Sequence, residues 1–198
     1  AFMAAVLSAD MDNTEKVVTL LDDCRQLSLQ VLPPDINRSD FQFTVDEKNR
    51  IIYGLVAVKG AGEAALSVMV EEREKHGAFK SLTDLCKRCS SQKVNRRVLE
   101  TLIKAGAFDS LGGTRRAMLE FLPEALRMAE QHNRDQGTGQ VDLFGGMFAG
   151  VKEDSPEMGV PTRPKNPEKE RLRLEKETLG LYLTGHPLDE YTEELAAL

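Results

Sequence analysis

The chain has 198 residues, of which 41% are hydrophobic and 29% charged. That composition is typical of a globular protein of one or two domains, and no apolar run is long enough to cross a membrane, so we expect no membrane partner. The formal net charge of −6 excludes a uniformly basic nucleic-acid-binding protein, which leaves nucleic acid as a partner only where the bases are concentrated in one part of the chain.

The N-terminal residues predict two helices. Residues 2–8 are typical of the end of a helix; they lack a basic flank, so we predict no signal peptide, and a start at Ala rather than Met predicts a fragment of a longer protein. Asp12 or Asn13 is expected to cap the second helix, with Glu15 completing a capping box from Asp12. Its apolar positions recur at helical spacing. They are Val17, Leu20, Leu21, Cys24 and Leu27.

The next segment predicts short strands. Residues 29–32 are apolar and predict a strand that Pro33 and Pro34 end, because proline cannot continue the hydrogen-bonded ladder. Residues 41–45 alternate between apolar and polar side chains, and residues 51–53 follow after a polar turn. This pattern predicts a β-hairpin with a loop longer than two residues.

Residues 58–63, with the sequence VKGAGE, predict a glycine hairpin before a helix over residues 63–75. Gly60 and Gly62 take φ > 0 without steric cost, and the exposed N–H groups of such a turn and of the helix start can bind an anion such as phosphate. Lys59 adds a positive charge beside them. The alternative is a simple turn, because short glycine motifs are often only that. The apolar face of the following helix consists of Ala65, Leu66, Met69 and Val70.

The next predicted helix is capped by Ser81 and contains two cysteines in a Cys-x-x-Cys pattern. A zinc site needs four ligands, and no second Cys or His pair lies at suitable spacing. Cys86 and Cys89 also fall on one apolar stripe with Leu82 and Leu85, so we predict buried core residues and no metal. Three cysteines in all predict a reducing, cytoplasmic compartment.

Asn95 is expected to cap a further helix, which ends in a second lysine-glycine turn at Lys104 and Gly106. The two turns lie about 45 residues apart and form a weak internal repeat. Thr114 is expected to cap a longer helix, in which Pro123 predicts a kink or a restart. The buried face of the helix after Asn95 is predicted to contain Val98, Leu99, Leu102 and Ile103.

Residues 136–167 are rich in glycine, proline and charge and predict a mobile linker. Helices are predicted again over residues 168–179 and 188–198, on either side of a loop. Within the linker lies a peptide with an apolar end, QVDLF, which either docks on a partner or pins the linker back onto the protein. Its residues are Gln140, Val141, Asp142, Leu143 and Phe144.

Charge is distributed unevenly along the chain. Residues 59–116 contain twelve bases and seven acids, a net charge of +5, which leaves −11 for the rest of the chain. A basic module inside an acidic chain is consistent with a nucleic-acid-binding surface, although a solvated helix surface of uneven charge is the alternative. No phosphate-binding Walker loop, nucleophile elbow or paired carboxylate set is present, so we expect no catalytic residue in this chain.

With these residues in view, the chain resembles the alpha (catalytic) subunits of bacterial DNA polymerase III through nearly all of its length. The resemblance rests on ordered matches rather than on one motif. The matching segments are residues 2–5, 12–17, 32–37, 53–55, 58–63, 95–100, 106–109 and 177–187.

The resemblance implies a mainly α fold with a small β-hairpin and a tandem helix-hairpin-helix DNA-binding module. It implies the end of a fingers domain over residues 1–34, the helix-hairpin-helix domain over 35–135, a linker over 136–167, and a helical lead into an oligonucleotide-binding domain over 168–198. The palm carboxylates that hold Mg²⁺ in such polymerases match no position here, so we expect no cofactor in this fragment.

The resemblance also implies partners: duplex DNA at the glycine hairpins, the sliding clamp (beta subunit) at the linker peptide, and other replicase subunits. Position 108 is Phe rather than Gly, which leaves phosphate contact at the second hairpin open. A non-DNA helical scaffold that acts only in protein–protein interaction is the competing class. The predicted DNA-contacting residues are Lys59, Gly60, Ala61, Gly62, Lys93, Arg96, Arg97, Lys104 and Gly106.

Overall fold

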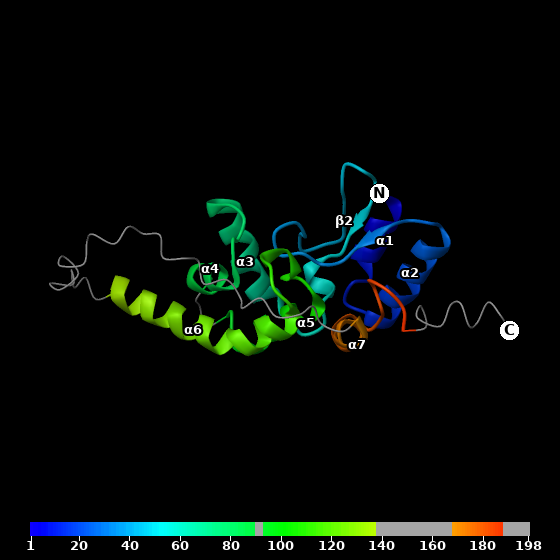
Figure 1. Cartoon of the computed structure of the whole chain (residues 1–198). Coiled ribbons are helices and arrows are strands. Elements are labelled where there is room, and N and C mark those ends of the chain that lie inside the picture. Colours follow the sequence, from blue (N-terminus) through cyan, green and yellow to red (C-terminus); the bar gives the residue numbers. More distant parts are fainter. Residues whose placement is uncertain (90–92, 138–167, 188–198) are drawn as a thin grey trace.

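The computed structural model describes residues 1–89, 93–137 and 168–187, and this part is mostly helical with one small sheet (Figure 1). The expected fold class is therefore confirmed. The helices are α1 (Phe2–Ala9), α2 (Thr14–Gln26), α3 (Glu63–His76), α4 (Leu82–Arg88), α5 (Arg96–Ala105), α6 (Arg115–Gly137) and α7 (Glu168–Leu179). The strands are β1 (Val31–Leu32), β2 (Thr44–Val45) and β3 (Ile51–Ile52), and single 3-10 turns cover Leu55–Ala57 and Asp109–Leu111.

The sheet has three strands in the order β1-β3-β2. The antiparallel pair of β2 and β3 is the predicted hairpin, and β1 adds to it in parallel, with Val31 opposite Ile51. The predicted strand at 29–32 begins two residues later than expected, at Val31. The parallel pairing was not predicted, because a strand partner separated by about 20 residues leaves no local signal in the sequence.

Side-chain caps define the starts of four helices, as predicted. The Asn13 side chain accepts hydrogen bonds from the Glu15 and Lys16 N–H groups, so Asn13 and not Asp12 is the cap of α2. Ser81 accepts from the Asp84 N–H at the start of α4, and Asn95 accepts from the Val98 N–H at the start of α5. Thr114 accepts from the Ala117 N–H at the start of α6. These bonds satisfy N–H groups that have no partner inside the helix.

The buried apolar side chains form one continuous cluster. The predicted inner faces of α3 and α5 are buried, as are Val17, Leu21 and Cys24 of α2. Leu27, the last residue of the apolar stripe predicted for this helix, is 61% exposed and does not lie in the core. Leu27 follows the end of α2 at Gln26, so the helical spacing that places the earlier residues on the core face no longer applies to it.

Helix α6 continues through Pro123, so the predicted restart does not occur. Proline removes one hydrogen bond from a helix interior and costs about 3 kcal/mol or more. Leu122 and Ala125, on either side of the proline, are fully buried, and α6 packs against α4 and α5. Tertiary packing therefore holds the helix together where local propensity favours a break. The helix ends at Gly137, so its last two residues lie within the predicted linker.

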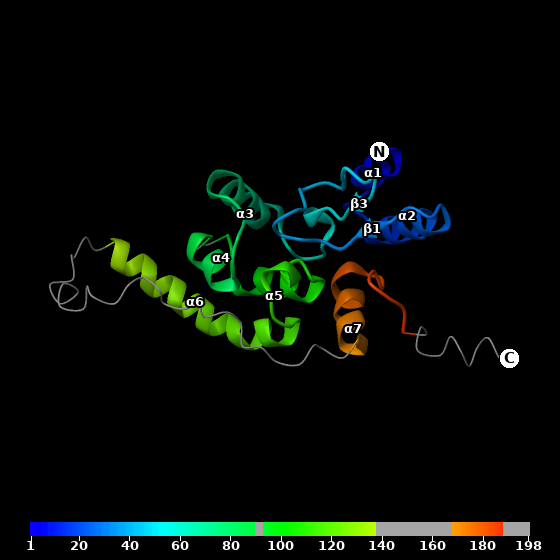
Figure 2. The ribbon, with the colours of Figure 1, turned by 45° about the horizontal axis from the view of Figure 1, so that its top comes forward.

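Helix α7 lies beside α5, although about 60 residues separate them along the chain (Figure 2). Its bounds, Glu168–Leu179, agree with the predicted helix. The following residues 180–187 are not helical, and the Tyr182 carbonyl accepts a hydrogen bond from the Arg25 guanidinium of α2. The predicted linker from residue 138 and the predicted last helix lie outside the described residues. In the described part of the chain, no helix has the length and apolar character needed to cross a membrane.

Candidate nucleic-acid interface

The first glycine hairpin leads directly into α3. Gly60 and Gly62 have φ of 85° and 72°, values that L side chains rarely adopt, and Gly62 is the residue before the helix. Ala61 between them is fully buried, whereas Lys59, Gly60 and Gly62 are exposed. A Cβ atom at either glycine would meet nothing within 4 Å, so open space lies in front of both backbone positions.

Two of the four N–H groups of this hairpin are used inside the protein. The Lys59 N–H donates to the Thr178 carbonyl of α7, with an N···O distance of 3.1 Å, and the Ala61 N–H donates to the Val58 carbonyl at 3.2 Å. The N–H groups of Gly60 and Gly62 have no hydrogen-bond partner among the described residues. They lie at the positive end of the α3 dipole, where an anion is stabilised.

The second hairpin is built differently. Gly106 has φ 86° and ends α5, and its N–H donates to the Ile103 carbonyl at 3.0 Å, while the Ala107 N–H donates to the Leu102 carbonyl at 3.0 Å. Gly106 is buried, and a Cβ atom there would collide with the Arg115 guanidinium. Phe108 is fully buried. These N–H groups complete the end of a helix, so this hairpin presents the Lys104 side chain rather than a row of free amides.

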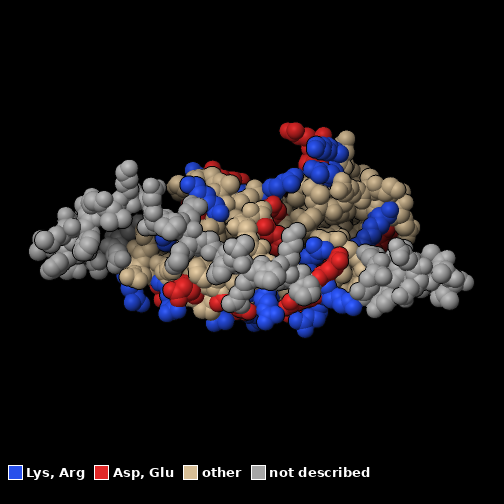
Figure 3. Space-filling view, viewed as in Figure 1, with Lys and Arg blue, Asp and Glu red and all other residues tan. Residues whose placement is uncertain are grey.

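The five predicted basic contact residues fall into two groups. Lys59, Lys93 and Arg97 are exposed, and their side chains form no ion pair within the part of the chain that the structure describes. Arg96 pairs with Glu100 of the same helix at 2.6 Å, and Lys104 pairs with Glu177 of α7 at 2.7 Å. On the face seen in Figure 3, Lys and Arg side chains lie along the lower edge, the side on which α6 lies, with Asp and Glu side chains between them, and further Lys and Arg side chains lie near the upper edge.

A buried ion cluster behind the second hairpin was not predicted. Arg115, at the start of α6, is 3% exposed and pairs with Asp109 at 2.8 Å and with Glu175 of α7 at 3.2 Å. Burial alone would lower the pKa of the Arg115 guanidinium, but the two carboxylates outweigh this and raise its pKa above the ordinary value. Glu175 lies 60 residues from Arg115 along the chain, so no sequence spacing pairs them.

Glu175 is 1% exposed and fixes the loop that follows α7. Its carboxylate accepts hydrogen bonds from the Leu183 N–H at 3.0 Å and the Thr184 N–H at 3.1 Å, and from the Thr184 hydroxyl at 2.7 Å. Every oxygen of this buried carboxylate is therefore paired. The cluster ties the second hairpin to α7 and to residues 183–184.

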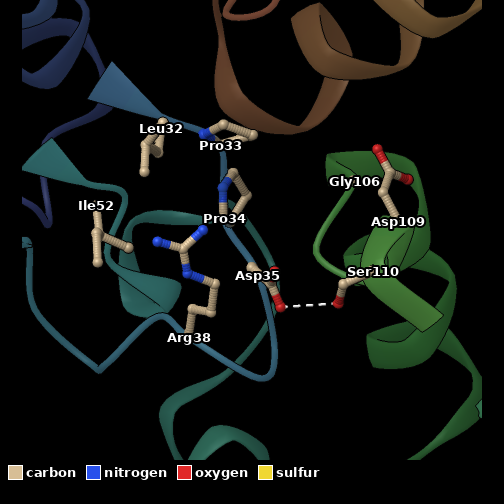
Figure 4. A pocket seen from close by; sticks show the side chains of 9 residues that line it. All are labelled: Leu32, Pro33, Pro34, Asp35, Arg38, Ile52, Gly106, Asp109 and Ser110. Atoms are coloured by element: carbon tan, nitrogen blue, oxygen red, sulfur yellow. Dashed lines mark hydrogen bonds between the residues drawn. The ribbon is translucent and has the colours of Figure 1, made fainter. Parts of the chain in front are cut away.

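The segment around Pro33 and Pro34 supports the second hairpin from the other side. The Ser110 hydroxyl donates to the Asp35 carboxylate at 2.9 Å, and the Ile36 N–H donates to the Ala107 carbonyl at 2.8 Å. Figure 4 shows the small pocket between these two segments, lined on one side by the prolines and on the other by Gly106 and its neighbours. Its volume is about 110 Å³, and Arg38 is one of the residues that line it.

Cys86 and Cys89 are 2% and 1% exposed, which agrees with the prediction that they are core residues. Burial raises the pKa of each thiol to about 12. The described residues contain no group of three or more His, Cys, Asp or Glu side chains placed to hold a metal ion. The predicted partner-binding peptide, residues 140–144, lies outside the described residues.

We expect Cys86 and Cys89 to be unreactive toward iodoacetamide at pH 8 in the native protein, because the thiolate is the nucleophile and a pKa near 12 keeps the thiols protonated. Cys86→Ala should lower stability by about 1 kcal/mol, and added zinc should leave the melting temperature unchanged. Mass spectrometry of alkylated native and denatured protein measures the first effect. Cys24→Ala, which removes another buried thiol, is the matched control for the stability measurement. Stoichiometric bound metal in the purified protein would contradict the prediction.

Comparison with known proteins finds similar sequences that match nearly the whole chain. A family model described as a helix-hairpin-helix motif matches residues 28–118. The chain is 51% identical over 197 residues to DNA polymerase III subunit alpha of Vibrio cholerae serotype O1 and 48% identical over 194 residues to that of Escherichia coli strain K12. The corresponding protein of Pseudomonas aeruginosa is 46% identical over 213 residues. Each comparison covers 98% of this chain but only 17% or 18% of the relative.

Proposed function

We propose that this chain binds the template–primer duplex as part of a DNA-directed DNA polymerase. The proposal is supported by its similarity over 98% of its length to DNA polymerase III alpha subunits and by the match to a helix-hairpin-helix motif. Nucleotidyl transfer itself would use Mg²⁺ held by palm carboxylates outside this chain. The chain's own task is to hold the duplex while synthesis proceeds, together with the clamp and other replicase subunits.

The observation that carries the proposal is the first hairpin. Two N–H groups without partners among the described residues, those of Gly60 and Gly62, lie at the start of α3. The Lys59 side chain, which forms no ion pair with any described residue, lies beside them. Backbone amides and a lysine at a helix start recognise phosphate oxygens rather than base edges. Binding should therefore be independent of DNA sequence. Lys93 and Arg97, exposed and free of ion pairs in the described structure, supply further phosphate contacts.

The proposal includes a tether to the sliding clamp through residues 140–144. Its support comes from the sequence: Gln140, Leu143 and Phe144 match the Gln-x-x-Leu-Phe pattern of clamp-binding peptides in the family that the chain resembles. Leu143 and Phe144 would enter an apolar pocket of the clamp while Gln140 forms hydrogen bonds at its rim.

The duplex proposal is tested in the full-length polymerase subunit by measuring the affinity for primed duplex DNA across salt concentrations. Lys59→Ala should weaken binding and reduce the slope of log K against log salt by about 0.9, the value for one lost phosphate contact. Gly60→Ala should weaken binding as well, because its φ of 85° strains an L residue and disturbs the turn.

The matched control is Lys48→Ala, which removes an exposed lysine from the turn between β2 and β3. It lowers the net charge equally but should leave the salt slope unchanged. Melting curves check that each variant is folded. If Lys59→Ala and Lys48→Ala give the same slope of log K against log salt, the first hairpin is not part of the DNA site. Duplex binding without salt dependence, or none at all, would favour the scaffold alternative.

A further inference from the structure

The C-terminal turn of α7 lies against both hairpins. The Thr178 carbonyl, one of the last in the helix, accepts the Lys59 N–H of the first hairpin at 3.1 Å. One residue earlier, the Glu177 carboxylate pairs with the Lys104 ammonium of the second hairpin at 2.7 Å. The neighbouring cation, Lys176, is directed at the Tyr182 ring, 5.5 Å from its centroid. The turn therefore presents negative groups to the residues proposed to hold phosphate.

A helix C-terminus carries a partial negative charge, and Glu177 adds a full one. DNA phosphate carries charge of the same sign and would form its hydrogen bonds with the same Lys104 ammonium. A phosphate at the second hairpin must therefore displace Glu177 or be repelled by it. Since the Gly106 and Ala107 amides are used inside the protein, Lys104 is the group through which this hairpin would contact phosphate.

Two carboxylates of α7 differ in how firmly they are held. Glu175 is 1% exposed, with four hydrogen-bonding partners, and anchors the helix. The Glu177 side chain is 55% exposed and its ion pair with Lys104 is partly open to water. Exposed pairs of this kind contribute little to stability. Glu177 can therefore release Lys104 while Glu175 keeps α7 in place.

We propose that Glu177 is an internal competitor of duplex DNA: it occupies Lys104 when DNA is absent and must yield it before the second hairpin takes up a phosphate. This inference rests on the proposed duplex-binding function. It makes occupation of the second hairpin by phosphate conditional on the position of α7. The first hairpin, whose Lys59 side chain is unpaired in the described structure, binds without this step.

The test measures equilibrium binding of the full-length polymerase subunit to primed duplex DNA. Glu177→Gln should tighten binding about two- to fivefold, the effect expected of releasing one exposed ion pair. The matched control is Glu170→Gln, which removes the same charge from α7 at a residue that forms no ion pair with either hairpin in the described structure. It should change affinity less, because it alters only the distant field.

Lys104→Met supplies the second readout. In the native background it should cost little, because Glu177 already neutralises Lys104. In the Glu177→Gln background it should remove the gained affinity and reduce the salt slope by about one phosphate contact. If Glu177→Gln and Glu170→Gln bind DNA equally well while Lys59→Ala still weakens binding, only the proposed competition between Glu177 and DNA is overturned. Loss of the Lys59→Ala effect as well would overturn the duplex-binding function and this inference with it.

Discussion

Glu175→Ala is expected to lower the local stability of the second hairpin and α7 by about 3 kcal/mol or more, the effect of breaking a buried ion pair. The substitution leaves the Arg115 guanidinium, 3% exposed, with Asp109 as its remaining carboxylate partner. It also removes the acceptor of the Leu183 and Thr184 N–H groups. The Arg115 guanidinium stays buried with one carboxylate fewer to balance its charge, which is why the effect exceeds that of losing one hydrogen bond.

Hydrogen exchange at the Leu183 and Thr184 amides measures this effect, since both donate hydrogen bonds to the Glu175 carboxylate and should report local opening. The matched control is Glu177→Ala, which removes a carboxylate two residues away whose side chain is 55% exposed. It should change protection by less than about 1 kcal/mol. Replacing Glu175 and Arg115 together by Met should recover part of the loss, because no buried charge is left without a partner; the Asp109 carboxylate, 46% exposed, is then solvated by water. Equal exchange in the two alanine variants would show that the cluster does not anchor α7.

Leu143→Ala combined with Phe144→Ala should abolish most of the affinity for the sliding clamp. An apolar anchor buried in a partner's pocket costs about 2 kcal/mol or more when truncated, and 2 kcal/mol corresponds to about a 30-fold loss of affinity. Leu143 and Phe144 are the adjacent large apolar pair of the peptide, whereas Asp142 is expected at the rim. Asp142→Ala is therefore the matched control and should change affinity little.

Two measurements separate a tether from a linker anchor. Surface plasmon resonance gives clamp affinity, and primer extension on long and short templates gives processivity. In the proposed arrangement, duplex DNA holds the polymerase and the clamp close together, so a modest affinity suffices for a large gain in effective concentration. The double variant should lose processivity on long templates and retain extension of short ones. Clamp binding that survives the double change would place the contact elsewhere on the chain and leave the peptide as an internal anchor of the linker.

Local chemistry determined the features that the sequence predicted well. The caps at Ser81 and Asn95 depend on a side chain that reaches an amide three residues away, and the inner faces of α3 and α5 follow from helical spacing. The turn at Gly60 and Gly62 follows from the freedom of glycine at positive φ. Each of these depends on residues within one or two helical turns, so the linear sequence contains the information.

The tertiary structure alone decided which basic side chains are free and which amides are accessible. Lys59 and Lys104 look alike in the sequence, each before a glycine turn, but α7 returns from more than 70 residues away and pairs Glu177 with Lys104. The same return buries Arg115 against Glu175 and occupies the Lys59 N–H. Electrostatic and hydrogen-bonding partners depend on distance in space, which for these residues is set by the packing of α5 and α7 and is independent of their separation along the chain.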